Sequence, residues 1–156
     1  MANERLTQLT QFYPCEFQRA PRSFVHLSYW RAHEFRQFLL YTWYTVLHDI
    51  LPESNRLLFR LLHVFARILA DPSKVNERAT IDYTVTLVEL FNSSSCETFG
   101  DQWAIYNVHG LLHVPEDVFK FGCLDHDSCF KFEACMFILK HLVRSGRHPL
   151  KQAVNG

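Results

Sequence analysis

The chain has 156 residues, of which 48% are hydrophobic and 15% aromatic, with only 5 Gly and 6 Pro. This composition excludes a disordered chain and is typical of one globular domain, residues 1–156, built from long elements. Lys plus Arg and Asp plus Glu number 16 each, so the net charge is zero and nucleic acid can be bound only through a local basic patch.

The cysteines and the hydropathy pattern bear on the compartment. There are 5 cysteines, an odd number, and the chain starts with the polar stretch MANERLTQLTQ, which does not look like a signal peptide. We therefore expect an intracellular protein in a reducing compartment. No apolar run reaches the roughly 18 residues that a membrane span needs, so no membrane contact is expected.

Two helices are predicted in the first third of the chain. Residues 2–13 fit a short amphipathic helix. The stretch SYWRAHEFRQFLLYTWYTVLHDIL, residues 28–51, fits a long one, with Ser28 as its N-cap and Pro52 as its stop. Apolar residues recur along it at three- and four-residue steps: Phe35, Phe38, Leu39, Trp43 and Val46.

The middle third predicts a helix pair. Residues 54–69 carry a wide apolar stripe, which indicates a buried helix, and Asp71-Pro72 forms the following turn. Residues 76–92 are rich in β-branched side chains but keep a helical period, and we favour a helix. The run from Ser93 to Gly100 is predicted to be a loop.

A further helix is predicted from Asn107 to Lys120, kinked at Pro115, and a last one over residues 131–145. The whole pattern predicts an all-α protein, an irregular bundle of five to six helices.

His109 and His113 stand four residues apart and would project from one face of a helix, where two imidazoles can hold one Zn²⁺. Gly110 follows His109, so the glutamate of the zincin motif is missing. Cys123 and Cys129 are candidate further ligands, although no Cys-x-x-Cys pair is present. The alternative is that both histidines are ordinary polar residues of a helix and that the thiols are buried.

The last predicted helix carries Glu133 in its first turn, followed on the same face by Lys140 and Arg144. Such a face is consistent with a metal-binding carboxylate on a helix that runs along phosphates. The alternative is a solvated face with an ordinary mixture of charges.

Three stretches in order resemble one family of proteins. They are EFQRAPRSFVHLSYWRAHEFRQFLLY, IYNVHGLLHVPEDVFKFGCLDHDSCFKFE and the basic tail KHLVRSGRHPLKQ. They look like the part of transposase-derived proteins that follows the second catalytic aspartate, and the likeness covers roughly residues 15–152. That family is similar to CACTA-type transposases and, more remotely, to the Transib and V(D)J recombinase group.

The resemblance implies an RNase H-like enzyme with three acidic residues, of which Glu133 would be the third. Residues 14–100 would be the helical insertion, and residues 103–150 would hold the zinc-binding pair His109 and His113 and the glutamate helix. Mg²⁺ would be bound only where a complete set of three carboxylates is assembled.

Departures from the family pattern limit what is implied. The two aspartates belong to β-strands that this chain does not show, and the family's Cys-x-x-Cys is missing. TWYTVL, starting at Thr42, replaces the usual Gly-Pro-Val-Val-Leu, which would turn a helix break into a continuous helix. The chain resembles the C-terminal half of a transposase without its β-core, so we do not expect strand transfer by this chain alone.

We expect a nuclear, transposon-derived domain that binds nucleic acid or protein. The residues expected to contact DNA phosphates are Arg19, Arg22, Lys140, Arg144, Arg147 and Lys151. One alternative is a module for homodimerisation or for binding a protein partner through exposed apolar surface. Another is a metal-dependent strand-transfer subunit completed by a second chain, and a vestigial reading frame or a zinc hydrolase is a further possibility.

Overall fold

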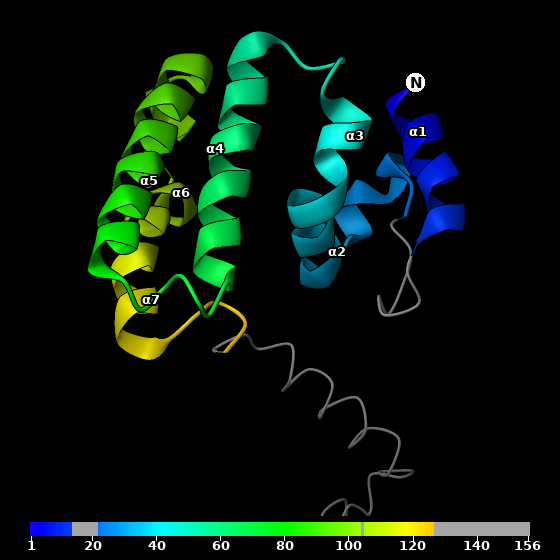
Figure 1. Cartoon of the computed structure of the whole chain (residues 1–156). Helices are drawn as coiled ribbons and strands as arrows, with labels where there is room; N and C mark the ends of the chain where they lie inside the picture. Colours follow the sequence, from blue (N-terminus) through cyan, green and yellow to red (C-terminus); the bar gives the residue numbers. More distant parts are fainter. Residues whose placement is uncertain (14–21, 104, 127–156) are drawn as a thin grey trace, which may run out of the picture. The chain divides into compact units, whose positions relative to one another are not determined.

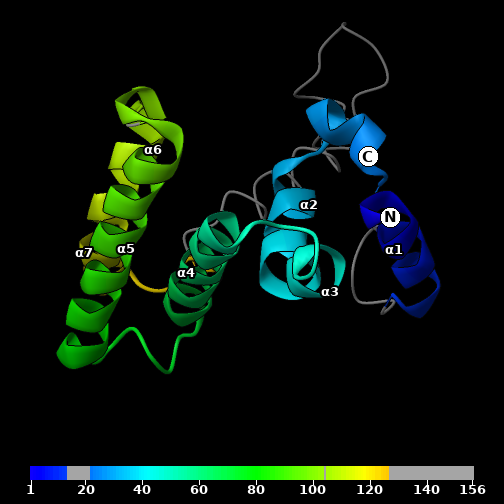
Figure 2. The ribbon, with the colours of Figure 1, turned by 90° about the horizontal axis from the view of Figure 1, so that it is seen from above.

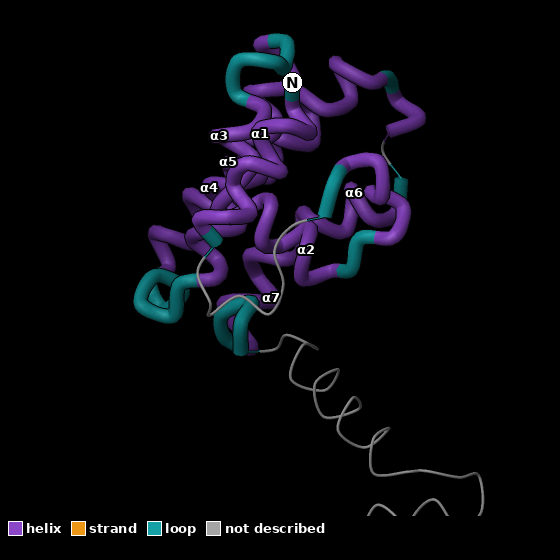
Figure 3. The backbone as a smooth tube through the Cα atoms, turned by 90° about the vertical axis from the view of Figure 1, so that its right-hand side faces the viewer, coloured by secondary structure: helices purple, strands orange, loops and turns teal. Residues whose placement is uncertain are grey.

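The computed structural model describes residues 1–13, 22–103 and 105–126 (Figure 1). Their backbone forms helices joined by loops and contains no strand (Figure 3), so the predicted all-α class is confirmed. Met1–Asp125 make one compact unit, distinct from His126–Gly156. Among the described helices, none is both long and apolar enough to cross a membrane.

The N-terminal helix forms as predicted. α1 (Ala2–Leu9) continues into a 3-10 turn, η1 (Thr10–Phe12), and its apolar side buries Leu6 completely. Residues 14–21, which follow, lie outside the described part of the chain.

The predicted helix start at Ser28 is wrong. Ser28 lies inside a 3-10 segment, η2 (Phe24–Tyr29), and the backbone of Trp30 is extended, so the α-helix begins only at Ala32. Trp30 stacks on Phe24 with ring centroids 5.6 Å apart. Tertiary packing of these rings therefore interrupts the helix at a place where the sequence period predicts one continuous helix.

α2 (Ala32–Gln37), a π-helical segment η3 (Phe38–Thr42) and α3 (Trp43–Leu47) follow one another without a break. The helix thus continues through Thr42 and Trp43, as the replacement of Gly-Pro predicts. The π-helical segment changes which residues face inward. Phe38 and Trp43 are buried as predicted, whereas Phe35 is exposed.

α4 (Glu53–Ala70) and α5 (Arg78–Phe99) form the predicted helix pair. The loop predicted from Ser93 to Gly100 is wrong, because α5 continues to Phe99. The hydroxyls of Ser93, Ser95 and Thr98 donate back to carbonyls of the helix: Ser95 Oγ, for example, donates to Asn92 O at 2.8 Å. Gly100, with φ of 87°, then ends the helix.

The next helix runs through its proline as predicted. α6 (Tyr106–Gly110), a 3-10 turn η5 (Leu111–His113) and α7 (Val114–Phe121) are continuous. Pro115 lies in the first turn of α7, where a backbone N–H would have no hydrogen-bond partner within the helix. Proline is therefore tolerated at this position. The predicted helix over residues 131–145 lies outside the described part.

Two clusters of apolar side chains hold the unit together. The larger cluster joins η3, α4, α5 and α7 through residues such as Leu40, Leu69 and Val88. The smaller cluster joins α1, η2, η3 and α3 through Leu6 and Trp43. α4 lies between α5 and the α2–α3 helix in both views (Figures 1 and 2), and it contacts each of them.

Candidate functional site

The two predicted zinc ligands do come together. His109 lies in the last turn of α6 and His113 ends η5, and their ring centroids are 5.6 Å apart. Both residues are exposed. Within the described residues, no group of three or more His, Cys, Asp or Glu side chains is placed to hold a metal ion. The pair can supply two ligands, which is half of a tetrahedral zinc site.

Cys123 is in the apolar core, not on an accessible surface. It is buried in the larger cluster with residues such as Leu69 and Val118. The neighbouring Leu124 N–H donates to Leu69 O at 2.9 Å and fixes the chain there. Cys123 therefore serves packing in the described structure. The other candidate ligand, Cys129, lies outside the described residues.

Arg22, predicted to contact phosphate, is engaged inside the protein. Its Nε and Nη2 donate to the two carboxylate oxygens of Glu34 at 2.7 and 2.5 Å, and Nη2 also donates to Tyr29 O. Glu34 is 0% exposed and also accepts from the Arg31 N–H at 2.8 Å. The hydrogen bond from Arg22 lowers the pKa of Glu34. Arg22 thus neutralises a buried carboxylate.

The remaining predicted site residues fall outside the described part of the chain. They are Arg19, Glu133, Lys140, Arg144, Arg147 and Lys151. The described residues contain a basic row that is not among the predicted site residues.

The basic row lies along α4. Arg56, Arg60 and Arg67 are spaced four and seven residues apart, so they repeat on one side of the helix over roughly 16 Å. Arg60 is exposed and forms no ion pair within the described ranges. Arg67 is exposed too, and its Cζ lies 5.5 Å from the ring centroid of Tyr41. Arg56 donates to His48 O at 3.1 Å and pairs with Glu53.

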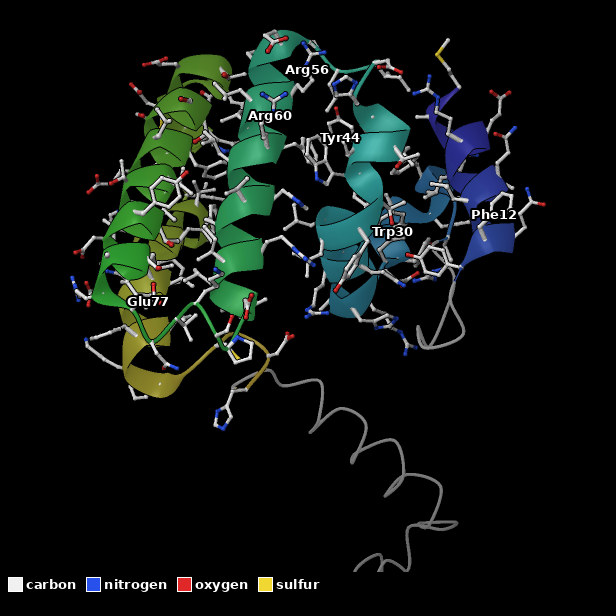
Figure 4. All side chains as sticks on the ribbon, viewed as in Figure 1. Phe12, Trp30, Tyr44, Arg56, Arg60 and Glu77 are labelled. Carbon is white, nitrogen blue, oxygen red and sulfur yellow. The ribbon has the colours of Figure 1, made fainter. Side chains whose placement is uncertain are left out.

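An aromatic row runs beside it on the neighbouring helix. Tyr41 and Tyr44 are 50% and 53% exposed. The Tyr44 ring lies 4.4 Å from the His48 ring and 5.6 Å from the buried Trp43 ring, centroid to centroid. Figure 4 shows Arg56 and Arg60 on α4 and Tyr44 on α3, the neighbouring helix in that view.

We call Tyr41, Tyr44, His48, Arg56, Arg60 and Arg67 together the α3–α4 face. Carboxylates lie near both of its ends. Asp49 is hydrogen-bonded to His48 at 2.7 Å, which lowers the pKa of Asp49, and Glu53 pairs with Arg56. At the other end, hydrogen bonds from Ser73 and the nearby charges of Lys74 and Arg67 lower the pKa of Asp71. Arg60, between the two ends, carries the least compensated positive charge.

Elsewhere in the described structure, several arginines are compensated by carboxylates. Arg78 on α5 forms two hydrogen bonds with Glu116 at 2.6 and 3.1 Å, which lower the pKa of Glu116, and Arg36 pairs with Asp125 at 2.5 Å. α5 itself carries three acidic residues against one basic one: Asp82, Glu89 and Glu97 against Arg78. Within a chain of zero net charge, α4 is thus a basic helix and α5 an acidic one.

A signal for the basic row was present in the sequence. Between Asp49 and Asp71 the only acidic residue is Glu53, while three arginines share one helical face. The period of leucines in this stretch indicates the buried side, and the same period applied to arginines would have marked the exposed one. The aromatic row on the neighbouring helix could not be predicted in this way, because the π-helical segment η3 has more residues per turn than an α-helix and changes which residues face outward.

No protein-family model, curated protein or solved structure matches the chain. Evidence for a function therefore comes from the residues of this chain.

Proposed function

We propose that this chain is a transposase-derived helical domain that binds nucleic acid and does not catalyse strand transfer alone. The observation that carries the binding function is the row of Arg56, Arg60 and Arg67 on one side of α4, of which Arg60 and Arg67 are exposed and form no ion pair among the described residues. Arginines in such an array match phosphate oxygens in geometry and charge.

The absence of catalysis is proposed from the chemistry that strand transfer needs. Two divalent ions held by three carboxylates activate the attacking oxygen and stabilise the leaving one. The described residues hold no group of three such side chains. The alternative is a subunit whose missing aspartates come from another chain, which predicts Mg²⁺-dependent strand transfer only in a mixture of the two.

The α4 row can be tested by removing its charge. Arg60→Gln with Arg67→Gln should weaken binding of a fluorescent 20-mer by about tenfold or more in 50 mM salt. Because each phosphate contact releases about 0.7 to 0.9 counterion, the slope of log K against log salt should fall by roughly 1.5. Fluorescence anisotropy over a salt series measures both quantities.

The matched control removes two positive charges from exposed positions elsewhere, Lys74→Gln with Lys120→Gln. We expect this variant to bind within about twofold of the parent protein. Equal losses in both double variants would show a general charge effect, and no binding at 50 mM salt would remove the proposed function. Circular dichroism of each variant checks that the helices are retained.

Zinc at His109 and His113 is part of the proposal, supported by the 5.6 Å approach of the two rings. Mass spectrometry of the native protein should then show about one zinc per chain, lost in the His109→Ala, His113→Ala variant. Cys123→Ala should keep the zinc, because that thiol is buried in the core. A metal-free parent protein would overturn the zinc proposal without affecting the α4 row.

A nuclear location belongs to the same proposal, since the resemblance is to proteins that act on chromosomal DNA. Imaging of a fluorescently tagged chain in cells tests it.

The second candidate function is protein interaction. It is supported by exposed apolar side chains that follow one another after α5: Phe99 and Trp103, whose ring centroids are 4.6 Å apart, then Ile105 and Tyr106. Such surface can serve a homodimer or a partner protein. Sedimentation equilibrium would show self-association that weakens in a Tyr106→Ser variant, and a monomer at all concentrations would exclude the homodimer.

A further inference from the structure

We infer that the α3–α4 face binds a single strand of nucleic acid, with its phosphates on Arg60 and Arg67 and a base stacked on Tyr44. The inference rests on the proposed nucleic-acid-binding function and adds the form of the ligand. It follows from the way the two helices pair, from the exposure of the tyrosine rings and from what surrounds α4.

The two helices run antiparallel, so that residues near the end of the α2–α3 helix lie beside residues near the start of α4. At one end, Arg56 bonds to His48 O at 3.1 Å. At the other end, Arg67 lies over Tyr41. Between them, Trp43 of α3 stacks on Phe59 of α4 with centroids 5.4 Å apart and holds the helices together.

Tyr44 is held as a platform. The buried Trp43 ring meets it edge to face, at 87°, and the His48 ring lies 4.4 Å away, so the Tyr44 side chain is ordered while 53% of it stays exposed. An ordered, accessible ring offers a nucleobase a surface for stacking, since every base has a π-face, and the arginines of the same face can contact its phosphate. Binding of phosphates alone does not require such an exposed ring.

The surroundings of α4 argue against a duplex. A helix reads the major groove, about 12 Å wide, by entering it. α4 is flanked by α5 on one side and by the α2–α3 helix on the other (Figures 1 and 2), so it cannot enter a groove alone. A duplex could touch only its phosphates, and its bases, stacked inside, could not reach Tyr44.

DNA and RNA single strands share the chemistry that this face recognises, which is phosphate plus a free base. A 2′-hydroxyl is the difference between them. The experiment therefore uses both, as dT20 and rU20. They are compared with a 20-bp duplex and with an abasic 20-mer that has the same number of phosphates as dT20.

Fluorescence anisotropy should show dT20 or rU20 bound at least tenfold more tightly than the duplex or the abasic strand. Tyr44→Leu should weaken binding of the preferred single strand roughly tenfold and change duplex binding less than twofold. Tyr44→Phe, which keeps the ring, should restore the affinity. Tyr83→Leu removes another half-exposed tyrosine, on α5, and should have no effect.

The outcomes separate this inference from the proposed function. Equal or tighter binding of the duplex, or full affinity in Tyr44→Leu, would overturn the single-strand inference. If the α4 arginine variants still weakened duplex binding, the proposed function would stand without it. If no nucleic acid were bound at all, both would fail. Tighter binding of rU20 than dT20 would assign the face to RNA, and the reverse to DNA.

Discussion

The Glu34 carboxylate is completely buried, yet it keeps its charge because Arg22 and the Arg31 N–H both donate to it. These bonds tie η2 to the start of α2, since Arg22 precedes η2 and also donates to Tyr29 O. A charged group in the interior is tolerated only while its partners are in place.

Replacing Glu34 by Gln should remove the negative charge and one of the two oxygens to which Arg22 donates. We expect this to destabilise the protein by about 3 kcal/mol at pH 7. The hydrogen bond from Arg22 lowers the pKa of Glu34 in the folded state, so the unfolded state takes up a proton first on acidification. The stability that Glu34 provides is therefore fully present above its ordinary pKa of about 4.3 and is lost as the pH falls through the lower folded value. Urea unfolding of the parent and Glu34→Gln proteins between pH 3 and pH 7 measures this.

The difference between the two midpoints should stay constant above about pH 5.5 and shrink below about pH 4.5. Glu97→Gln serves as the control, because Glu97 is an exposed carboxylate on α5. A pH-independent difference would mean that the effect of the mutation is one of shape and not of charge.

The sequence predicts part of this arrangement. It places Glu34 near a helix start, where a carboxylate is favourable. It cannot show that Glu34 is buried, because the partner Arg22 lies 12 residues earlier and reaches it only after η2 has turned the chain. Arg22 was for the same reason predicted as a phosphate contact: a lone arginine in a sequence carries no sign of its partner.

At the scale of elements, the ends of helices decide where sequence reasoning succeeds. Ser93, Ser94 and Ser95 suggested a loop, because serine competes with the helix for backbone hydrogen bonds. In α5 the Ser93 and Ser95 hydroxyls donate to carbonyls three residues back, and Phe91 packs just before them, so the helix continues. The signal that ends it is Gly100, whose φ of 87° favours glycine.

Replacing Gly100 and Gly110 by alanine should change the stability of the protein in opposite directions. Gly100→Ala forces a Cβ into the left-handed region and should cost about 1 kcal/mol, although the space is adequate, the nearest atom being 3.6 Å away on Gln102. Gly110 has a helical φ of −56° and open space around a Cβ, so Gly110→Ala should stabilise by about 0.5 kcal/mol. Thermal unfolding of the two variants compares them directly, and a fall in both would show that Gly110 has a role beyond backbone freedom.

The π-helical segment η3 is the element that the sequence hides most completely. The apolar period from Phe35 to Val46 fits an α-helix, yet the wider turn from Phe38 to Thr42 brings Leu40 into the larger core and leaves Tyr41 exposed beside Arg67. A pattern search that assumes 3.6 residues per turn cannot find this shift. The aromatic row of the α3–α4 face was missed for that reason.

At the scale of the whole unit, the two apolar clusters share helices. The α2–α3 helix supplies Leu40 to the larger cluster and Trp43 to the smaller one, and Phe59 of α4 stacks on Trp43 at 5.4 Å. The all-α class follows from periodicity alone, but this sharing does not, because it depends on which helix faces which. Helices that serve two cores are expected to make Met1–Asp125 unfold as one.

Leu6→Ala, in the smaller cluster, and Leu69→Ala, in the larger, should each lower one common unfolding transition by about 3 kcal/mol, because both side chains are fully buried. Near-ultraviolet circular dichroism reports mainly on Trp30 and Trp43 in the smaller cluster, and far-ultraviolet circular dichroism on the long helices α4 and α5. The two signals should give coincident urea transitions in the parent and in both variants, with exposed Leu90→Ala as a control that changes neither.

If Leu6→Ala instead lost the tryptophan signal first and left the helical signal intact, the smaller cluster would be a separate cooperative unit. The α3–α4 face, which spans both clusters, would then lose its aromatic row before its arginines, and nucleic-acid binding would fail before the protein unfolds.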